Sequence, residues 1–176
     1  MSARTGFDQL LTTALVPEFC SDPSRLVQPS GFNDKSNRVS DEDAQDFLRL
    51  WNANLVLHQG RGLYLIGASK VREQFFWSGA KSEGPRTFTL WMEPVITVGA
   101  IARLHFDFGW PFTQLGAQSK DWAYDIVAVS SDMTGTIIAG EVKKSRKEID
   151  DWVGLMLEFG SNPDAPVPLS GKRRNA

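Results

Sequence analysis

The part of the chain that most restricts its fold is a pair of apolar runs separated by a short polar segment. Residues 122–129 and 136–143 are rich in Ile, Val and Ala, and the segment SDMTG at 131–135 between them has the composition of a turn. Two such runs around a turn are typical of an antiparallel β-hairpin. The sequence therefore predicts a hairpin whose turn is centred near Met133.

Two carboxylates interrupt these apolar runs at equal distances from the turn. Asp125 precedes Met133 by eight residues and Glu141 follows it by eight, so the hairpin places the two acids opposite each other. Opposed residues in an antiparallel pair have Cβ atoms roughly 4.5–5.5 Å apart, and like charges placed there destabilise the pair. Side chains alternate between faces along a strand, so Lys143 projects on the same face as Glu141. We expect these three charged groups to converge at one edge of the sheet.

The spacing allows two interpretations of this cluster. A divalent cation such as Mg²⁺, Mn²⁺ or Ca²⁺ would offset the repulsion, because carboxylate oxygens are hard ligands. Lys143 would then stabilise charge on a phosphate or orient a metal-bound water. Alternatively, Asp125 and Glu141 are strand-end residues in water, with Lys143 as a solvated partner. The spacing by itself does not choose between these interpretations.

Composition restricts the class of protein. The 176 residues are 41% hydrophobic and 23% charged, as in ordinary globular proteins. A net charge of -2 gives no overall basic field, so any binding to nucleic acid must depend on local patches. The single cysteine, Cys20, cannot form an internal disulfide, which suits a cytoplasmic location. No apolar run is long enough for a membrane span, and the N-terminus does not have the pattern of a secretory signal.

The N-terminal half predicts short elements of mixed type. Turn-rich residues 78–86 follow them and form a candidate boundary, which divides an N-terminal region at 1–85 from a core at 86–176. The elements expected before that boundary are a helix at 6–15 that ends at Pro17, a long loop at 21–39, a helix capped by Ser40, a hairpin at 54–66 and a short helix at 69–77.

The C-terminal half has a more regular pattern. We expect a helix from about Trp91 to Phe108 with Pro94 in its first turn, and then a strand at 112–118 before the hairpin. A last helix at 145–159 is capped by Ser145. Its apolar stripe comprises Ile149, Trp152, Val153 and Met156. The order from residue 91 is helix, strand, strand, strand, helix.

This order, with Asp125 followed by Glu141-Val142-Lys143, resembles the PD-(D/E)xK nuclease superfamily over about residues 91 to 160. The resemblance implies an α/β (α+β) restriction-endonuclease-like core, with a mixed central sheet flanked by helices. It further implies that Asp125 and Glu141 hold Mg²⁺ (or Mn²⁺), that Val142 offers its backbone carbonyl, and that Lys143 assists the hydrolytic water or the transition state. Glu93 matches the acid that many members carry on the preceding helix. It is a candidate third ligand, or simply an acid favoured by the helix dipole.

The sequence departs from the family pattern in two places. Tyr124 stands where the family has a Pro before the Asp. A fourth strand is expected after the last helix, but the sequence there is Pro-rich and ends in the basic run at 172–176. We therefore expect that the fourth strand is irregular, that the 86–176 core is truncated, or that the N-terminal half or a partner chain completes it.

The function predicted from the resemblance is metal-dependent hydrolysis of phosphodiester bonds in DNA. Lys144, Ser145, Arg146 and Lys147 would contact the phosphate backbone at the entrance of the last helix, although the acids that follow make a solvated mixed-charge face an equal alternative. The first rival is an inactive nuclease-like module that binds nucleic acid, a partner protein or a second copy as a homodimer. The second rival is a structural or inhibitory protein whose hairpin acids lie on the surface.

Other residue types give weaker signals. His58 and His105 lie in different elements with no Cys or His at ligand spacing, so zinc is not expected. The tryptophans could stack on nucleotide bases, but packing in the core is their more usual role. The candidate stacking residues are Trp77, Trp91, Trp110 and Trp122.

Overall fold

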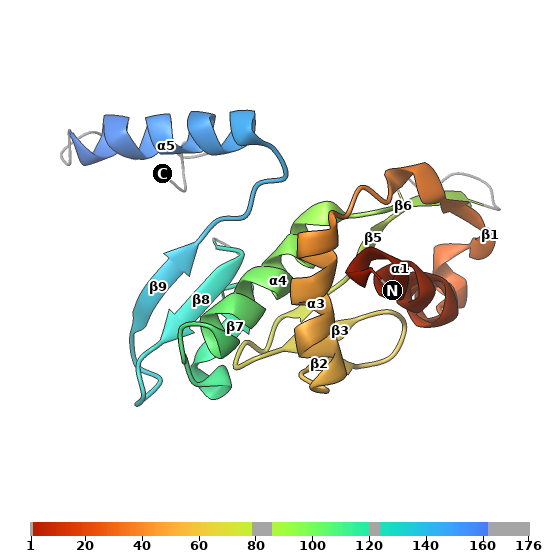
Figure 1. The fold of residues 1–176 in the computed structure, drawn as a ribbon, viewed down its shortest axis with the longest axis horizontal. Helices are drawn as coiled ribbons and strands as arrows, with labels where there is room; N and C mark the ends of the chain where they lie inside the picture. Colours follow the sequence, from red (N-terminus) through yellow and green to blue (C-terminus); the bar gives the residue numbers. More distant parts are fainter. Residues whose placement is uncertain (1, 79–85, 120–123, 162–176) are drawn as a thin grey trace.

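The computed structural model describes residues 2–78, 86–119 and 124–161. Helices and small sheets alternate along the chain (Figure 1), and the predicted α+β class is confirmed. The elements before residue 79 are α1 (Ala3–Leu10), a π-helical turn (Leu11–Leu15), α2 (Val16–Cys20), β1 (Val27–Asn33), α3 (Asp41–Asn52), β2 (Val56–His58), β3 (Tyr64–Ile66), β4 (Arg72–Glu73) and β5 (Phe76–Trp77). Those after residue 85 are β6 (Arg86–Leu90), α4 (Met92–Phe106), β7 (Leu115–Ala117), β8 (Ile126–Val129), β9 (Thr136–Gly140) and α5 (Arg146–Gly160).

The strands of the described ranges form three sheets, ordered β1-β6-β5, β2-β3-β4 and β7-β8-β9. The first sheet is mixed, because β1 runs parallel to β6 while β5 runs antiparallel to it. The β7-β8-β9 sheet, which carries the candidate site, is antiparallel throughout. An isolated bridge between Gly67 and Gly116 joins the segment after β3 to β7.

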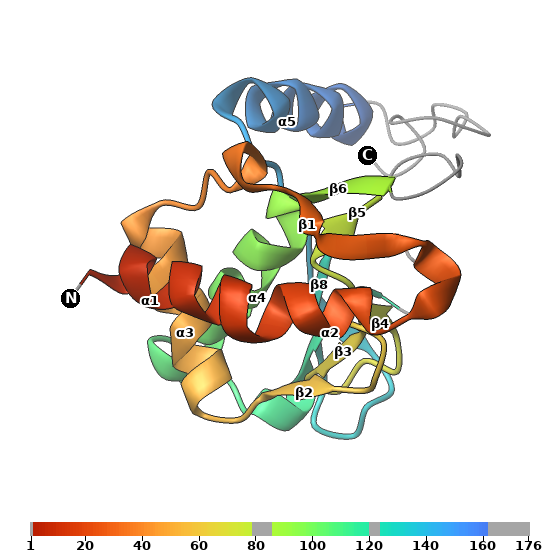
Figure 2. The same ribbon diagram turned by 90° about the vertical axis from the view of Figure 1, so that its right-hand side faces the viewer.

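The predicted end of the first helix at Pro17 is wrong. Figure 2 shows α1 and α2 as one continuous rod that passes through Pro17 and ends at Cys20. The residues before Pro17 adopt a π-helical turn, Leu11–Leu15. A wider turn accommodates a residue that has no N–H to donate, so the proline does not break the helix here.

Two further predictions in the N-terminal half are wrong, and both concern strands. The predicted loop at 21–39 contains β1, and the predicted helix at 69–77 is replaced by β4 and β5. These strands are short, and β1 contains Pro29 and Gly31, residues that disfavour strands in isolation. Pairing with β6 and β3 stabilises them, and a local sequence pattern does not show that pairing.

Several predicted elements are confirmed. The hydroxyl of Ser40 accepts a hydrogen bond of 3.0 Å from the Asp43 N–H and caps α3. The 54–66 hairpin forms with Leu57 opposite Leu65. Helix α4 begins at Met92 with Pro94 in its first turn. These features depend on local chemistry, which a sequence shows directly.

The hydrophobic core includes residues from both sides of the predicted 78–86 boundary. Helix α3 packs along α4, and Arg103 on α4 forms an ion pair with Asp46 on α3. Phe47 on α3 contacts Phe75, which is fully buried just before β5. The region after residue 85 therefore forms its core together with the N-terminal region.

Helix α5 lies apart from this core and is joined to β9 by an extended segment (Figure 1). Three residues of its predicted apolar stripe are largely exposed: Ile149, Val153 and Met156. Trp152 is half-buried over the candidate site. None of the helices in the described ranges is long and apolar enough to cross a membrane.

Candidate active site

The hairpin brings Asp125 and Glu141 to adjacent strand ends, as the spacing predicts. Ile126 on β8 pairs with Gly140 on β9, and the two acids are the next residues beyond this pair. The register shifts near the turn, between Ala128 and Val129. On the side of this shift away from the turn, the pairs are symmetric about Met133, so the shift brings Asp125 opposite Glu141.

The carboxylate of Asp125 is held from both sides. One oxygen, Oδ2, accepts a hydrogen bond of 2.8 Å from the backbone N–H of Val142. The other, Oδ1, accepts one of 3.2 Å from the side-chain amide of Gln118. The backbone carbonyl of Asp125 also accepts the Gln118 N–H at 2.8 Å. Asp125 thus links the end of β7 to the segment that follows β9.

Glu141 and Lys143 form an ion pair beside Asp125. The side chain of Glu141 is 11% exposed and that of Lys143 is 25% exposed. Burial raises the pKa of Glu141, and the nearby Asp125 carboxylate raises it further, while the hydrogen bond from Lys143 opposes the shift. Burial by itself would lower the pKa of Lys143, but the hydrogen bond and charge of Glu141, helped by Asp125 and Glu93, raise it above its ordinary value. Lys143 is therefore a cation at neutral pH.

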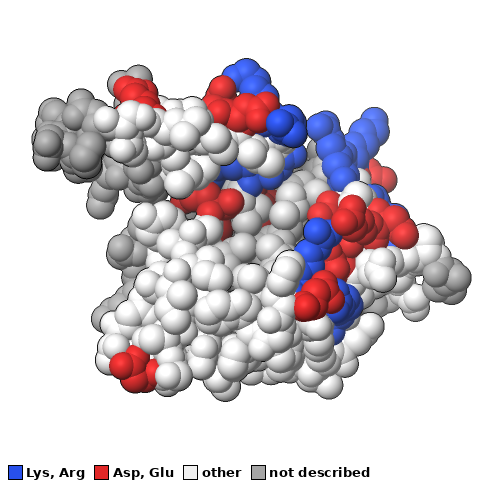
Figure 3. All heavy atoms as spheres, turned by 60° about the vertical axis from the view of Figure 1, so that its left-hand side comes forward, with Lys and Arg blue, Asp and Glu red and all other residues white. Residues whose placement is uncertain are grey.

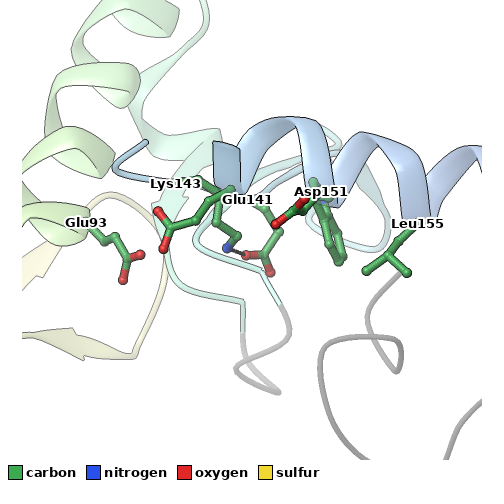
Figure 4. A pocket seen from close by; sticks show the side chains of 7 residues that line it. Glu93, Glu141, Lys143, Asp151 and Leu155 are labelled. Carbon is green, nitrogen blue, oxygen red and sulfur yellow. Dashed lines mark hydrogen bonds and ion pairs between the residues drawn. The ribbon is translucent and has the colours of Figure 1, made fainter. Parts of the chain in front are cut away.

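A pocket of about 220 Å³ opens beside this pair, between the start of α4 and helix α5 (Figure 4). Figure 3 shows acidic and basic side chains gathered around the hollow beneath α5. Glu93 lines the pocket from the first turn of α4, so the structure brings this candidate third acid to Glu141 and Lys143. Its carboxylate also accepts a hydrogen bond of 3.0 Å from the indole N–H of Trp91. The remaining lining residues are Glu148, Asp151, Trp152 and Leu155.

The four residues predicted to contact phosphates lie exposed where α5 begins. The hydroxyl of Ser145 accepts the Glu148 N–H at 3.3 Å, which confirms the predicted cap. Arg146 and Lys147 form ion pairs of 2.8 and 2.7 Å with acids one turn later, Asp150 and Asp151. Lys144 is also exposed. This start of α5 has the mixed charge that the sequence left open as an alternative.

Sequence reasoning missed two residues of the site, Glu73 and Gln118. Glu73 lies in β4, where a helix was predicted, and it is only 5% exposed. Burial raises its pKa to about 7, and the charge of Asp125 adds to the shift, while a hydrogen bond with Gln118 opposes it. Gln118 has a left-handed backbone with φ of 61°, which is uncommon for a residue with a side chain. The only signal for Glu73 was a charged residue shortly before two aromatic ones, which is too common to single it out.

The histidines do not line the pocket of this site. The Nδ1 atom of His58 is 3.7 Å from Glu18, and His105 hydrogen-bonds the Trp110 carbonyl at 2.8 Å. Trp77 is exposed, and Trp122 lies outside the described residues.

The described ranges contain no group of three or more His, Cys, Asp or Glu side chains with the geometry to hold a metal ion. Asp125 and Glu141 contribute two side chains, and the Val142 carbonyl that the family pattern implies is a backbone group. With Glu93 the predicted set has three acids, and these three do not form such a group in the described ranges. Metal binding at this site stays a prediction.

We compared the chain with protein-family models, with curated proteins and with solved structures, and none of them matches it. The functional interpretation therefore depends on the site itself.

Proposed function

We propose that this chain is a metal-dependent nuclease that hydrolyses phosphodiester bonds in DNA, with a restriction-endonuclease-like core formed by α4, β7, β8, β9 and α5. A single observation carries the proposal: Asp125 and Glu141 occupy adjacent strand ends, and Lys143 is ion-paired with Glu141 at the edge of a pocket. Two acids and a lysine in this arrangement are typical of phosphodiester hydrolysis assisted by a cation.

The donor set suits Mg²⁺ or Mn²⁺. Glu141 is largely buried beside Asp125, and Lys143 is the one cation paired with these two acids among the described ion pairs. A divalent cation would offset the remaining negative charge, with Asp125, Glu141 and the Val142 carbonyl as ligands and Glu93 as a further acid in the pocket. When bound, the cation would polarise the phosphate and lower the pKa of a water ligand.

Lys143 has the role of a cation rather than a base in this proposal. Its raised pKa keeps the ammonium group protonated at neutral pH. A fixed positive charge beside the pocket stabilises the negative charge that develops on a phosphate during hydrolysis. Because Glu141 hydrogen-bonds this ammonium, it also fixes the position of the charge.

The start of α5 supports DNA binding beside the pocket. Arg146 and Lys147 are exposed, and their partners Asp150 and Asp151 are exposed too. Solvent screens exposed ion pairs of this kind, so phosphate groups can compete with the acids for Arg146 and Lys147. Contacts to phosphates position the nucleic acid without reading its sequence.

A second function is favoured by one observation, the exposed apolar side chains of α5. Ile149, Val153, Met156 and Leu157 are all more than two-fifths exposed, and such a row suits contact with another chain. An inactive nuclease-like module that binds nucleic acid or a partner protein in a larger assembly would use this face.

Incubation of plasmid DNA with Mg²⁺ or Mn²⁺ tests the proposal. We expect the wild-type chain to cleave, and Glu141→Ala and Lys143→Ala to lose cleavage. A control, Arg61→Ala, changes an exposed cation in the turn between β2 and β3 and should retain cleavage. The binding module is supported instead if the wild-type chain cleaves nothing at any metal or salt concentration but shifts DNA in a gel.

A further inference from the structure

We propose that Glu73 is a positioning residue of this site, which acts through the side-chain amide of Gln118 to hold the carboxylate of Asp125 in place for a divalent cation. The inference depends on the proposed function, because it assumes that Asp125 is a ligand. It brings a residue from the N-terminal region into a site that the sequence assigns entirely to the 86–176 core.

The segment that carries Glu73 is laid directly against β7. The Gly67–Gly116 bridge joins the two backbones, and the Ala68 N–H donates to the Leu115 carbonyl at 2.5 Å. Further along, the hydroxyl of Ser69 donates to the Gln118 carbonyl at 2.9 Å. These contacts run along the whole of β7 and end at Gln118.

Both glycines are needed for this close approach. Gly67 has a φ of 70°, and a Cβ there would overlap the Leu115 carbonyl. A Cβ at Gly116 would lie 2.9 Å from the Ser69 Cβ and backbone nitrogen. The contact therefore requires residues without side chains on both segments, and it fixes the distance between residues 67–69, which precede β4, and β7.

Gln118 is held by its neighbours in a conformation that it would otherwise avoid. Its backbone N–H donates to Asp125, its carbonyl accepts from Ser69, and its φ is 61°. Strained backbone of this kind persists where surrounding contacts over-determine it, and it is frequent at functional sites. In this conformation the side-chain amide donates to Asp125 at 3.2 Å and lies close enough to Glu73 to lower the pKa of that acid.

Glu73 itself has more hydrogen-bonding capacity than its surroundings use. Glu73 is only 5% exposed, and its Oε1 atom has no hydrogen-bond partner among the described residues. An apolar side chain would pack in this environment without the cost of burying a carboxylate. A buried acid with a free oxygen, beside an amide that holds Asp125, is explained by a role in the site rather than by stability.

The test compares three variants by calorimetric titration with Mn²⁺ in the absence of DNA, with unfolding in urea measured alongside. Glu73→Met removes the acceptor but keeps an apolar side chain of similar length. Glu73→Gln keeps an acceptor oxygen in the same place. Gln118→Gly keeps the left-handed backbone and removes the amide.

We expect Glu73→Met and Gln118→Gly to bind Mn²⁺ about 10–100-fold more weakly, as for other residues that orient a metal ligand. Glu73→Gln should retain most of the affinity, and Glu73→Met should be at least as stable as wild type. If Glu73 had only a structural role, Glu73→Met would not weaken Mn²⁺ binding without also lowering the stability of the protein.

Two other results overturn the inference, and they are distinguishable. If wild type binds Mn²⁺ and Glu73→Met binds it equally well, the positioning role is excluded while the proposed function stands. If wild type binds no Mn²⁺ or Mg²⁺, the metal-dependent function fails, and the role of Glu73 fails with it.

Discussion

The backbone N–H of Val142 donates a hydrogen bond of 2.8 Å to the carboxylate of Asp125, across the ends of β8 and β9. This bond continues the contact between the strands by one step beyond their last backbone pair, and it uses a side chain as the acceptor. The same bond fixes the residue whose carbonyl is the proposed third ligand, so the carboxylate and the backbone group are positioned together. The candidate site therefore begins where the backbone pairing of β8 and β9 ends, and the Asp125 carboxylate takes the place of the next backbone acceptor.

Removal of the Asp125 carboxylate should separate its structural role from its charge. Asp125→Ala leaves the Val142 N–H without this acceptor, and we expect it to lower the free energy of unfolding by about 1–3 kcal/mol. Asp125→Asn keeps one acceptor oxygen for the Val142 N–H and removes the repulsion with Glu141, but its amide nitrogen cannot accept from the Gln118 amide. It should therefore be more stable than Asp125→Ala in EDTA. Both variants should lose metal-dependent stabilisation. Urea unfolding with and without Mn²⁺ measures this, and equal stability of the two variants would exclude a structural role for the hydrogen bond.

Replacement of Lys143 should destabilise the metal-free protein. Lys143→Met leaves Glu141 largely buried without its cationic partner, and we expect a loss of about 1–3 kcal/mol in EDTA. The double variant Glu141→Gln with Lys143→Met removes both charges and should recover much of that loss. A double-mutant cycle measured by urea unfolding gives the coupling energy. A value near zero would mean that the ion pair contributes nothing, as at many exposed sites.

Because Glu73 is buried, we expect the free energy of unfolding to fall as the pH rises. Its pKa is about 7 in the folded protein against an ordinary value of 4.5, so the folded state binds the proton more tightly. Protonated Glu73 therefore stabilises the folded state by about 3 kcal/mol relative to the unfolded state. This contribution is fully present below pH 4.5 and is lost as the pH rises through 7. Unfolding in EDTA from pH 5 to pH 8 should therefore show a steeper fall for wild type than for Glu73→Gln. Parallel curves for the two proteins would contradict the burial of this acid.

The sequence predicted the part of the site that depends on one hairpin. The equal spacing of Asp125 and Glu141 from Met133 predicted their opposition, and the register of β8 and β9 next to the acids agrees with it. Counting did not show the register shift between Ala128 and Val129, on which this register depends. Helix α4 and the Ser145 cap were similarly local, and Glu93 followed from the family pattern.

The rest of the site depended on contacts between distant segments. Glu73 reaches Asp125 because β4 pairs with β3, and because two glycines let the segment after β3 approach β7 closely. Neither β1 nor β4 has a pattern that differs from a loop or a short helix, so their pairing could not be read from the sequence. The apolar stripe of α5 was predicted, but its exposure was not, since an apolar stripe alone does not show what covers it.

The contact between Gly67 and Gly116 should be sensitive to a single methyl group. Gly67→Ala combines a left-handed backbone with a Cβ that overlaps the Leu115 carbonyl, and we expect it to lower the free energy of unfolding by about 3 kcal/mol. Gly60→Ala is the matched control, because Gly60 has a φ of 87° but a Cβ added there would meet no atom within 4 Å, so only the backbone cost of about 1–2 kcal/mol applies. Urea unfolding of the two variants measures the difference. Mn²⁺ affinity should fall in Gly67→Ala alone, since only that change moves the segment that carries Glu73 relative to Asp125, and an equal effect of both substitutions would contradict this coupling.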